Sequence, residues 1–480
     1  MTADFPAPDA LADWTQLQGS PLHAGATALV IAPPLHVEWA RSVGGHLMGG
    51  PPVVAEGRVF VPVVDLADET AGGVVALDAR TGAPAWEVRT GAAVRNSPAV
   101  ADGVCVFGAS DGVVHAVGAQ TGSPLWTVDL GAGVREMSSF LYAAPTIADG
   151  VVYVGIQRRY VALDLMTGET IWSSDPGSPV WAVTYSAAAI GGGVGVSLVG
   201  RGKEGVFGFD AASGAELWRI LAPISTAVNA SPIIQGDTVF LANVESHVCA
   251  VDLVTGTVAW SHLLYDLGYV DWALGIMATP ALADGRLFVP TPREYLYAVD
   301  AGSGRELWKL GSATGVIHPL PYGTLAGGYT ASPVVTGDVV WAGGVDGVLR
   351  AARASSGELL WSRDLGAPIL TGPVPAGGWL FVGTWDGTVR ALAPGDPAEQ
   401  IFPPVDPGCE CALGRRRGGV GGGAGGALLA LLAAAALGAV GRGRRQRGDA
   451  ASCARMRART SLPTVVAARR ASSVSRDTRP

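Results

Sequence analysis

Charged side chains are scarce in this chain, since Asp, Glu, Lys and Arg together make up only 15% of 480 residues. Cysteine is also rare, with five residues, of which Cys105 and Cys249 each stand alone in an apolar run. This spacing implies no disulfide framework and leaves the redox compartment open, and we expect both cysteines to be small core residues. Glycine, in contrast, reaches 68 residues. The composition indicates turns and strands buried on both faces and argues against a soluble helical enzyme.

Sequence patterns that carry catalysis are missing as well. The chain has no His-Glu-x-x-His, no Gly-x-Ser-x-Gly and no phosphate-binding Gly-x-x-x-x-Gly-Lys motif. His115 and His247 lie inside strand patterns, where we expect satisfied core or edge residues rather than acid–base groups. The sequence therefore predicts no catalytic residues and no metal site.

Positive charge is concentrated at the carboxyl end. Residues 409–480 contain 14 arginines and three acidic residues, although the whole chain has a net charge of −8. The first 408 residues are consequently strongly acidic. Because phosphate binding needs a basic surface, we expect no nucleic-acid partner.

A repeated unit is clearest in residues 297–308. Alternating apolar residues lead to Asp300, Gly304 follows, and Trp308 stands at a fixed distance beyond the glycine. The alternation is typical of a half-buried strand, while the aspartate can accept hydrogen bonds from amides ahead of it and the glycine can adopt a positive φ. The unit is therefore interpreted as strand, tight turn and returning strand.

Seven copies of this unit follow one another at intervals of 40–53 residues between tryptophans. That interval matches one four-stranded propeller blade. The tryptophans are Trp86, Trp126, Trp172, Trp218, Trp260, Trp308 and Trp361, and the glycines four residues earlier are Gly82, Gly122, Gly168, Gly214, Gly256, Gly304 and Gly357. The aspartate is present in five copies and is replaced by Gly118 and Arg353 in the other two.

Two incomplete units at opposite ends of the repeats complement each other. Trp39 belongs to a single strand, and residues 373–392 supply three strands without a closing tryptophan. Together they predict an eighth blade that closes the ring. We therefore expect an all-β, eight-bladed β-propeller of four-stranded antiparallel blades over residues 34–395, with the last blade closed by the amino-terminal strand. A proline opens the innermost strand of every blade except the fourth: Pro52, Pro98, Pro145, Pro232, Pro280, Pro333 and Pro373.

Residues 1–33 form an irregular lead-in that we expect to pack onto the propeller. His23 lies within it and is interpreted as a surface or packing residue rather than a metal ligand, because no second ligand stands at a suitable spacing.

Additional chain length gathers in two connections between blades, residues 262–278 and 311–331. Such connections emerge on one face of a propeller, so this face is the expected binding face. An equally open alternative is that the aromatic residues only fill the mouth of the channel. The candidate residues are Tyr265, Asp266, Tyr269, Asp271, Trp272, His318, Tyr322 and Tyr329.

The repeat resembles that of the PQQ-like, quinoprotein-type β-propellers. The likeness rests on segments such as Ser97-Pro98-Ala-Val100-Ala-Asp-Gly103 and Val75-Ala-Leu-Asp78-Ala-Arg-Thr-Gly82 with Trp86. It implies eight blades and a tryptophan of each blade docked on its neighbour. The superfamily includes quinone-dependent dehydrogenases and also non-catalytic members, such as the lipoprotein scaffold of the outer-membrane barrel assembly machine.

Enzymes of this superfamily have a pair of adjacent cysteines over the quinone and a calcium site of Glu, Asn and Asp. This chain has no adjacent cysteines, and its candidate calcium ligands, Asp271, Asn229 and Asn243, share no motif. We therefore expect a non-catalytic binding or scaffold protein without a cofactor, whose partner is a protein or a small molecule. The alternative is a dehydrogenase of alcohols or sugars that uses pyrroloquinoline quinone (PQQ) and calcium.

The carboxyl end has three parts. A linker over 396–417 contains Cys409 and Cys411, an uncharged stretch over 418–440 is a candidate transmembrane helix, and a basic segment over 441–480 is expected to be disordered. This order resembles the sorting signals of myxobacterial surface proteins and implies a membrane anchor at the cell envelope or surface. A low-complexity tail without a membrane role is the alternative. No export signal is recognisable at residues 1–6, which a start site placed too far downstream would explain.

Overall fold

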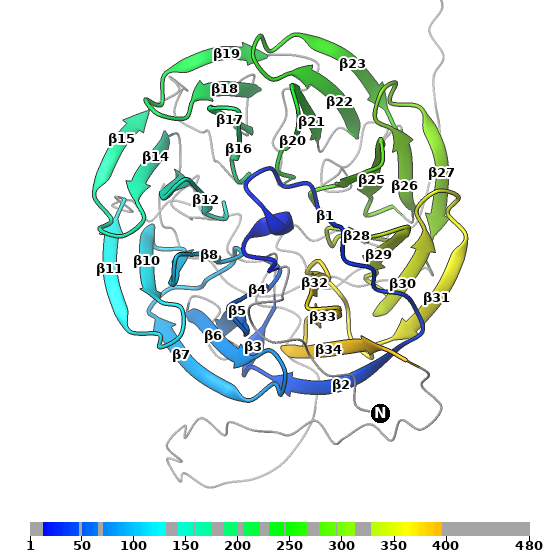
Figure 1. Ribbon diagram of the computed structural model, residues 1–480, viewed down its shortest axis with the longest axis horizontal. Coiled ribbons are helices and arrows are strands. Elements are labelled where there is room, and N and C mark those ends of the chain that lie inside the picture. Colours follow the sequence, from blue (N-terminus) through cyan, green and yellow to red (C-terminus); the bar gives the residue numbers. More distant parts are fainter. Residues whose placement is uncertain are drawn as a thin grey trace, which may run out of the picture. The chain divides into compact units, whose positions relative to one another are not determined.

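A computed structural model describes most of the first 395 residues as a ring of eight β-sheets around a central channel (Figure 1). All described residues belong to one compact unit, Met1–Leu413. The described ranges are 13–47, 50–65, 71–130, 143–156, 159–174, 186–198, 205–220, 230–243, 246–265, 278–293, 295–312 and 328–395. Residues 396–480, with the linker, Cys409, Cys411 and the candidate membrane-spanning stretch, lie outside them.

Seven blades are contiguous in sequence, each with four antiparallel strands ordered from the channel to the rim. The first four blades consist of β4 (Val53–Ala55), β5 (Arg58–Asp65), β6 (Gly72–Asp78) and β7 (Pro84–Thr90); β8 (Ala99–Ala101), β9 (Val104–Gly108), β10 (Val113–Gly118) and β11 (Pro124–Asp129); β12 (Thr146–Ala148), β13 (Val151–Ile156), β14 (Arg159–Asp164) and β15 (Thr170–Ser174); and β16 (Ala189–Gly191), β17 (Val194–Leu198), β18 (Val206–Asp210) and β19 (Glu216–Ile220).

The next three blades consist of β20 (Ile233–Gln235), β21 (Thr238–Ala242), β22 (His247–Asp252) and β23 (Val258–Leu263); β24 (Ala281–Ala283), β25 (Arg286–Pro290), β26 (Tyr295–Asp300) and β27 (Glu306–Gly311); and β28 (Val334–Thr336), β29 (Val339–Gly343), β30 (Val348–Arg353) and β31 (Leu359–Asp364). The predicted prolines immediately precede the innermost strands of their blades. Proline has no backbone N–H to donate, and it is tolerated here because the hydrogen bonds of the ladder begin after it.

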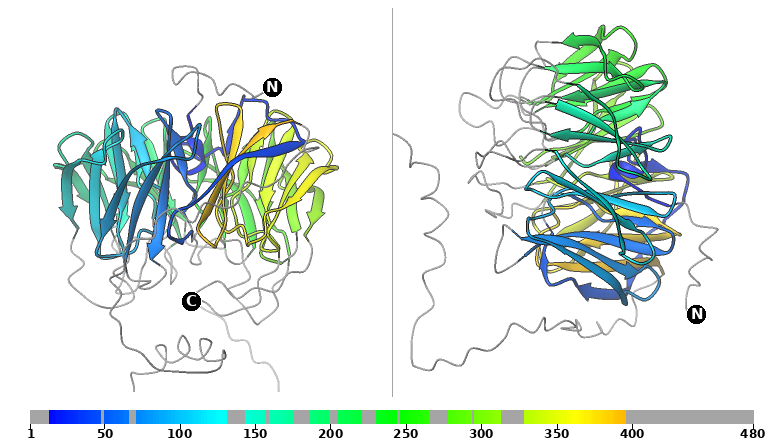
Figure 2. Two further views of the ribbon diagram at one scale, coloured as in Figure 1. Left: turned by 90° about the horizontal axis from the view of Figure 1, so that it is seen from below. Right: turned by 90° about the vertical axis from the view of Figure 1, so that its left-hand side faces the viewer.

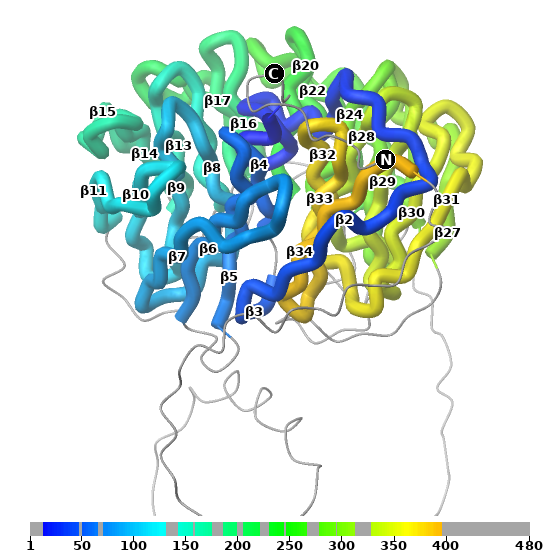
Figure 3. The backbone as a smooth tube through the Cα atoms, turned by 60° about the horizontal axis from the view of Figure 1, so that its bottom comes forward, coloured from blue at the N-terminus to red at the C-terminus, as the bar shows by residue number. Residues whose placement is uncertain are grey.

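The eighth blade is divided between the two ends of the propeller, as the sequence predicts. Its inner strands are β32 (Val374–Ala376), β33 (Trp379–Gly383) and β34 (Thr388–Pro394), and its outermost strand is β2 (Leu35–Ser42). The antiparallel ladder between β2 and β34 places Trp39 opposite Ala391. Figures 2 and 3 show the blue β2 and the orange β34 side by side at this junction. The ring is thus closed by backbone hydrogen bonds between residues far apart in sequence.

Two blades gain a short additional strand that the sequence did not predict. Strand β1 (Ala26–Thr27) pairs in parallel with β28, and β3 (Gly45–His46) pairs with β5 beyond β4. The only other regular element among the described residues is the 3-10 turn η2 (Leu17–Gly19). None of the described helical segments is long and apolar enough to cross a bilayer.

Burial changes from the channel to the rim in the way the composition suggests. All five residues of β9 are buried, whereas the outer strand β11 alternates between exposed and half-buried positions. Packed sheets cover both faces of the inner strands, while an outer strand has one face in water. This arrangement explains why so few charged residues are needed.

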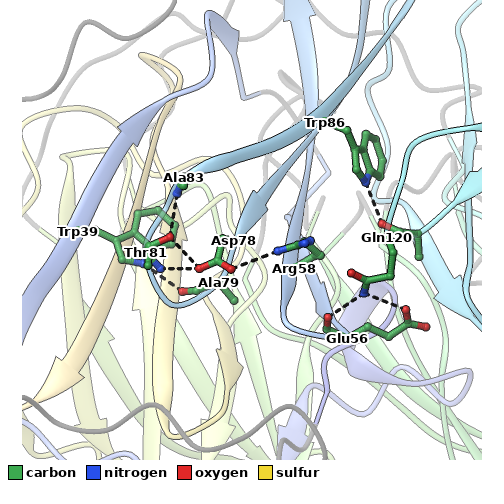
Figure 4. A network of polar contacts seen from close by, with 10 residues as sticks. Trp39, Glu56, Arg58, Asp78, Ala79, Thr81, Ala83, Trp86 and Gln120 are labelled. Atoms are coloured by element: carbon green, nitrogen blue, oxygen red, sulfur yellow. Dashed lines mark hydrogen bonds and ion pairs between the residues drawn. The ribbon is translucent and has the colours of Figure 1, made fainter.

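At seven of the eight junctions between blades, the tryptophan of one blade docks on the next blade. The Trp39 indole Nε1 donates a hydrogen bond to the Ala79 carbonyl at 3.0 Å, and a Cβ placed on Gly82 would lie 2.6 Å from the Trp39 ring (Figure 4). Gly82 also has a φ of +68°. The glycine is therefore required twice, for the turn and for the close approach of the ring. The same indole-to-carbonyl bond joins Trp86 to Ala119, Trp126 to Leu165, Trp172 to Ala211, Trp218 to Leu253, Trp260 to Ala301 and Trp308 to Ala354.

The predicted aspartate device is present in five of the turns that receive a tryptophan. Asp78 Oδ1 accepts hydrogen bonds from the Thr81 amide at 2.9 Å and the Thr81 hydroxyl at 2.7 Å (Figure 4). Asp164, Asp210, Asp252 and Asp300 have the same role in their blades. In the seventh blade Arg353 replaces the aspartate, and Asp338 from the adjacent turn accepts the Ser355 amide instead.

Candidate functional site

The lead-in segment, Trp14 to Thr27, lies in the centre of the ring, where Figure 1 shows it as the dark blue trace across the channel. It lies on the face that carries the tight turns between first and second and between third and fourth strands, which we call the turn face. The opposite face carries the connections between blades and is called the connection face. The segment therefore belongs to the channel rather than to the outer surface of the propeller.

This segment contacts the innermost strands of seven blades in their order around the ring. In each of these blades the middle residue of the innermost strand donates its backbone N–H to the segment, over 2.7–3.0 Å. The pairs are Val54 to Trp14, Val100 to Thr15, Ile147 to the Gln16 side chain, Ile190 to Pro21, Ile234 to Leu22, Leu282 to Ala24 and Val335 to Gly25. One inward N–H per blade is thus satisfied.

The eighth blade has a proline, Pro375, in the middle of its innermost strand β32. Proline has no N–H to donate. Pro375 is thus the one residue at this position that needs no acceptor from the segment. Seven blades thus offer an inward N–H that the segment accepts, and in the eighth blade proline removes the need for an acceptor.

Three polar side chains of the segment are buried in the channel. Gln16 holds the backbone of Ile147 with both ends of its amide, at 2.9 and 3.2 Å. Gln18 Nε2 donates to the carbonyls of Pro280 at 2.9 Å and Pro333 at 3.2 Å, and so joins the sixth and seventh blades. Buried amides of this kind replace water for carbonyl groups that the strands leave free.

His23 is fully buried and donates from Nδ1 to the Pro232 carbonyl at 3.1 Å. Burial lowers its pKa to about 4, so the imidazole is neutral at physiological pH. The prediction of a packing residue is confirmed, whereas a surface position is wrong. The signal in the sequence that indicates burial is weak, because a lone histidine between Leu22 and Ala24 has no distinctive pattern.

At the connection face, hydroxyl groups link the entries of neighbouring inner strands. Ser231 Oγ accepts the Ala187 amide at 3.1 Å, and Thr279 Oγ1 accepts the Ser231 amide at 2.9 Å. Each hydroxyl thus reaches back to the preceding blade across the fourth, fifth and sixth blades. These groups are neutral, and each accepts a hydrogen bond from within the ring.

A buried ion pair fixes the connection face of the seventh blade. Arg350 donates to both carboxylate oxygens of Asp346, at 3.0 and 2.5 Å, and both side chains are less than a tenth exposed. The Arg350 guanidinium lies 5.7 Å from the ring centre of Tyr329, which is fully buried and donates to the Gly311 carbonyl. Burial raises the pKa of the Tyr329 hydroxyl. Tyr329 is therefore a packing residue and not an exposed binding residue.

The eighth blade repeats this pattern with different partners. Arg390 donates to Thr384 Oγ1 at 2.8 Å, and that hydroxyl donates to Asp386 at 2.6 Å. Beside them Trp385 stacks on His46, with ring centres 4.5 Å apart. The motif Asp-Gly-x-x-Arg occurs at 346–350 and 386–390 and signals this arrangement, but the sequence reading did not identify it.

Tyr265 leads an aromatic group between the fifth and sixth blades. It stacks on Tyr297 with a 6.3 Å separation of ring centres, and the Lys309 ammonium lies 5.1 Å from the Tyr295 ring and 5.8 Å from the Tyr297 ring. Partial burial raises the Tyr265 pKa to about 12, so its hydroxyl is neutral at physiological pH. In this group Lys309 is exposed, Tyr265 and Tyr295 are half-buried, and Tyr297 is buried.

The remaining predicted binding residues, Asp266, Tyr269, Asp271, Trp272, His318 and Tyr322, lie outside the described residues. Of the histidines inside strands, His115 stacks on Phe107 and has a pKa lowered by burial. Cys105 and Cys249 are buried free thiols, as expected.

Of the three candidate calcium ligands, only Asn243 lies among the described residues. No cluster of three His, Cys, Asp or Glu side chains suited to a metal occurs among them. Asn243, one of the three candidate calcium ligands, uses its side-chain oxygen to accept the His247 amide at 2.9 Å, while Asn229 and Asp271 lie outside the described ranges. The described residues therefore bring no set of calcium ligands together.

Comparison with known proteins agrees with the architecture. Outer membrane protein assembly factor BamB of Moranella endobia is 23% identical over 355 residues, which are 74% of each chain. Tetrathionate hydrolase of Acidithiobacillus ferrooxidans is 23% identical over 269 residues, and the match spans 48% of this chain and half of that enzyme. The solved quinohemoprotein alcohol dehydrogenase ADHIIG of Pseudomonas putida HK5 superposes with a TM-score of 0.65 at 15% identity, over 82% of this chain and 81% of the enzyme, and this likeness concerns the fold alone.

A family model described as outer membrane protein assembly factor BamB matches residues 36–176, 161–313 and 292–399. These matches cover the described propeller from β2 to β34 and more than half of the chain. The protein therefore belongs to the PQQ-like β-propeller family that this model describes.

Proposed function

We propose that this protein is a non-catalytic β-propeller that binds a protein partner at the cell envelope through its connection face. The family supports this proposal, since the relative from Moranella endobia is named as an assembly factor of the outer membrane. The observation that carries it is the state of the channel. Its turn-face end is filled by the chain's own segment, and the described hydroxyl groups near the other end bond to neighbouring blades.

The aromatic group around Tyr265 is the part of the connection face best suited to contact a protein. Tyrosines supply a large contact area at a small cost in side-chain entropy, and they are enriched among the residues that dominate interface energies. The rings of Tyr265 and Tyr297 are already held by stacking, and Lys309 adds a positive charge beside them. Because Glu306 lies 3.9 Å from the Lys309 ammonium, the group carries both signs of charge, and an amphipathic surface of a partner would suit it.

A site-specific crosslinking experiment tests the partner-binding face. A photoreactive amino acid replaces Tyr265 on the connection face in one variant and Val254, an exposed residue of the turn face in the same blade, in a control variant. We expect a defined crosslinked protein from position 265 and none from position 254 in cells that produce the protein naturally. Equal crosslinking from both positions, or none from position 265, would contradict the proposed face.

The alternative function is a dehydrogenase that uses pyrroloquinoline quinone and calcium. A match of 34% identity over 111 residues to the quinohemoprotein alcohol dehydrogenase ADH-IIG of Pseudomonas putida favours it. The purified full chain is incubated with the quinone and calcium, desalted, and assayed for quinone absorbance and for dye reduction with alcohols and sugars. The non-catalytic proposal predicts neither retained quinone nor turnover. Stoichiometric retention together with turnover would establish the enzyme instead.

We further propose that residues 418–440 anchor the protein in a membrane, with processing near Cys409 and Cys411. The support is the uncharged stretch followed by arginines in the sequence. Membrane fractionation of the full chain and of a chain ended at Pro407 tests this idea. Membrane association of only the full chain is expected, and a soluble, unprocessed full chain would rule out the anchor.

A further inference from the structure

We propose that the turn-face mouth of the channel is a binding site for a peptide that bends around the ring, and that residues 14–27 of the chain are its resident occupant. This inference is independent of the partner-binding face proposed above, because it concerns the opposite end of the channel. It assigns to the inner strands a role beyond lining the ring. It also implies that ligands do not pass through the channel while the segment is in place.

The pattern of backbone donors indicates that the mouth is built to receive a peptide. Peptide carbonyls of the segment, or in one case a side-chain amide oxygen, accept one N–H from the same position of each of seven blades. At both ends the contact becomes strand pairing, since Trp14 bridges to Val54 in antiparallel fashion and Ala26 pairs with Val335 in parallel. Addition of an extended peptide to free strand edges is an established mode of peptide recognition. Pro375 marks the single blade that offers no such donor.

The segment follows the ring because it bends at left-handed residues. Gln18, Gly19, His23 and Gly25 have φ values of 53°, 86°, 57° and 66°. Such values are uncommon outside glycine, and at these residues the chain bends. A straight strand would not reach seven blades in succession. A Cβ on Gly25 would lie 2.4 Å from Gln18 Nε2, so this glycine also leaves room for the amide that bridges two blades.

Side chains add specificity to the backbone contacts. Trp14, Gln18 and His23 are 3%, 2% and 0% exposed, and they contact the first, the sixth and seventh, and the fifth blades. Gln18 is the most demanding of these residues, because its amide satisfies carbonyls from two blades at once. A peptide that lacks this amide leaves buried carbonyls unpaired, which is costly.

The connection from the segment to β2 offers a place to separate occupant and site. Val30 is 72% exposed, whereas Ile31 next to it is buried. A protease recognition sequence inserted between Leu29 and Val30 in the full chain allows the segment to be cut loose after folding. The same insertion left uncut, and the chain without insertion treated with the protease, are the controls.

After the cut, we expect the amino-terminal fragment to co-elute with the body on gel filtration and to exchange with a labelled synthetic peptide of residues 13–29. A peptide with Gln18→Ala should compete at least tenfold more weakly, and a scrambled peptide should not compete. The uncut control should bind no labelled peptide, because its own segment occupies the site.

Two results would overturn the proposal. In the first, the fragment leaves a body that keeps its circular dichroism spectrum and melting temperature, and the labelled peptide binds no better than the scrambled one. In the second, the body unfolds when the fragment leaves, which would make the segment part of the folding core rather than a ligand.

Discussion

Trp39 lies opposite Ala391 across the ladder of β2 and β34, and its indole reaches forward to the Ala79 carbonyl of the first blade. One residue near the beginning of the propeller thus joins the last blade to the first. Closure of the ring and docking between neighbouring blades depend on the same side chain.

Substitution of Trp39 should therefore weaken the closure in graded steps. Trp39→Phe removes the 3.0 Å hydrogen bond to Ala79 but keeps an aromatic ring, and should cost about 1 kcal/mol. Trp39→Ala also removes the packing of a residue that is only 7% exposed and should cost about 3–5 kcal/mol. Chemical denaturation of both variants measures these losses, and equal losses would contradict the separate role of the hydrogen bond.

Gly82→Ala and Gly103→Ala form a matched pair that separates backbone strain from ring contact. The two glycines have similar φ values, +68° and +74°, but only Gly82 faces the Trp39 ring, while Gly103 faces open space. We expect Gly103→Ala to cost about 1–2 kcal/mol from the left-handed conformation. Gly82→Ala should cost a further 1–3 kcal/mol, roughly, from the steric clash. Thermal unfolding of the two variants checks the difference.

His23 should make the folded state sensitive to mild acid. Its folded pKa of about 4 is below the ordinary value near 6.5, so the unfolded chain binds a proton first as the pH falls. Stability from this group is complete above about pH 6.5 and is lost between about pH 6.5 and 4, by about 3 kcal/mol. The variant His23→Gln should lose this dependence, and unfolding measured at pH 7 and pH 5 tests it. An unchanged slope in the variant would show that another group is responsible.

The turn aspartates should affect the stability of the fold in a separate, more acidic pH range. Hydrogen bonds from Thr255 lower the pKa of Asp252, and the corresponding residues lower those of Asp164, Asp210 and Asp300. A lowered folded pKa contributes stability that is present above the unfolded value near 3.9 and is lost as the pH falls through the folded value. Combined Asp→Asn substitution of these turn aspartates should reduce the dependence of stability on pH below about pH 4. The dependence due to His23, at higher pH, should remain unchanged. Acid unfolding curves of the two sets of variants should therefore differ in their pH range.

Much of the propeller could be predicted because its recurring contacts are local. The interval from Asp78 through Gly82 to Trp86 is fixed by one turn, and its sevenfold recurrence predicts both the number of blades and the division of the eighth. The position of the lead-in segment could not be predicted in the same way. Its partners, such as Val54 and Val335, are backbone N–H groups, which every residue but proline has and which no side-chain pattern reveals.

The candidate site was predicted only in part for a related reason. Tyr265 and Tyr329 belong to the same kind of connection in the sequence, yet one remains partly exposed and the other is fully buried under Arg350. Arg350, which lies over the Tyr329 ring, forms an ion pair with Asp346 between strand β30 and the loop before it. Spacing along the chain does not show which aromatic side chain such a pair will cover.

That ion pair provides another matched test. Asp346→Asn leaves the buried Arg350 without its counter-charge and should cost about 3–5 kcal/mol. Asp386→Asn in the eighth blade disturbs a carboxylate that accepts the Thr384 hydroxyl, and should cost about 1 kcal/mol. Denaturant unfolding of the two variants measures the difference. Similar losses would mean that Arg350 is reached by water or by another acceptor.

The divided eighth blade also has a consequence during folding. Until β2 pairs with β34, the edge of β34 is open and can pair with β2 of another copy of the protein. Refolding at high protein concentration should therefore yield exchanged dimers in which each molecule donates β2 to the other, with every native contact retained. Dilution before refolding favours the monomer, because the donor strand of the same chain then meets the edge first.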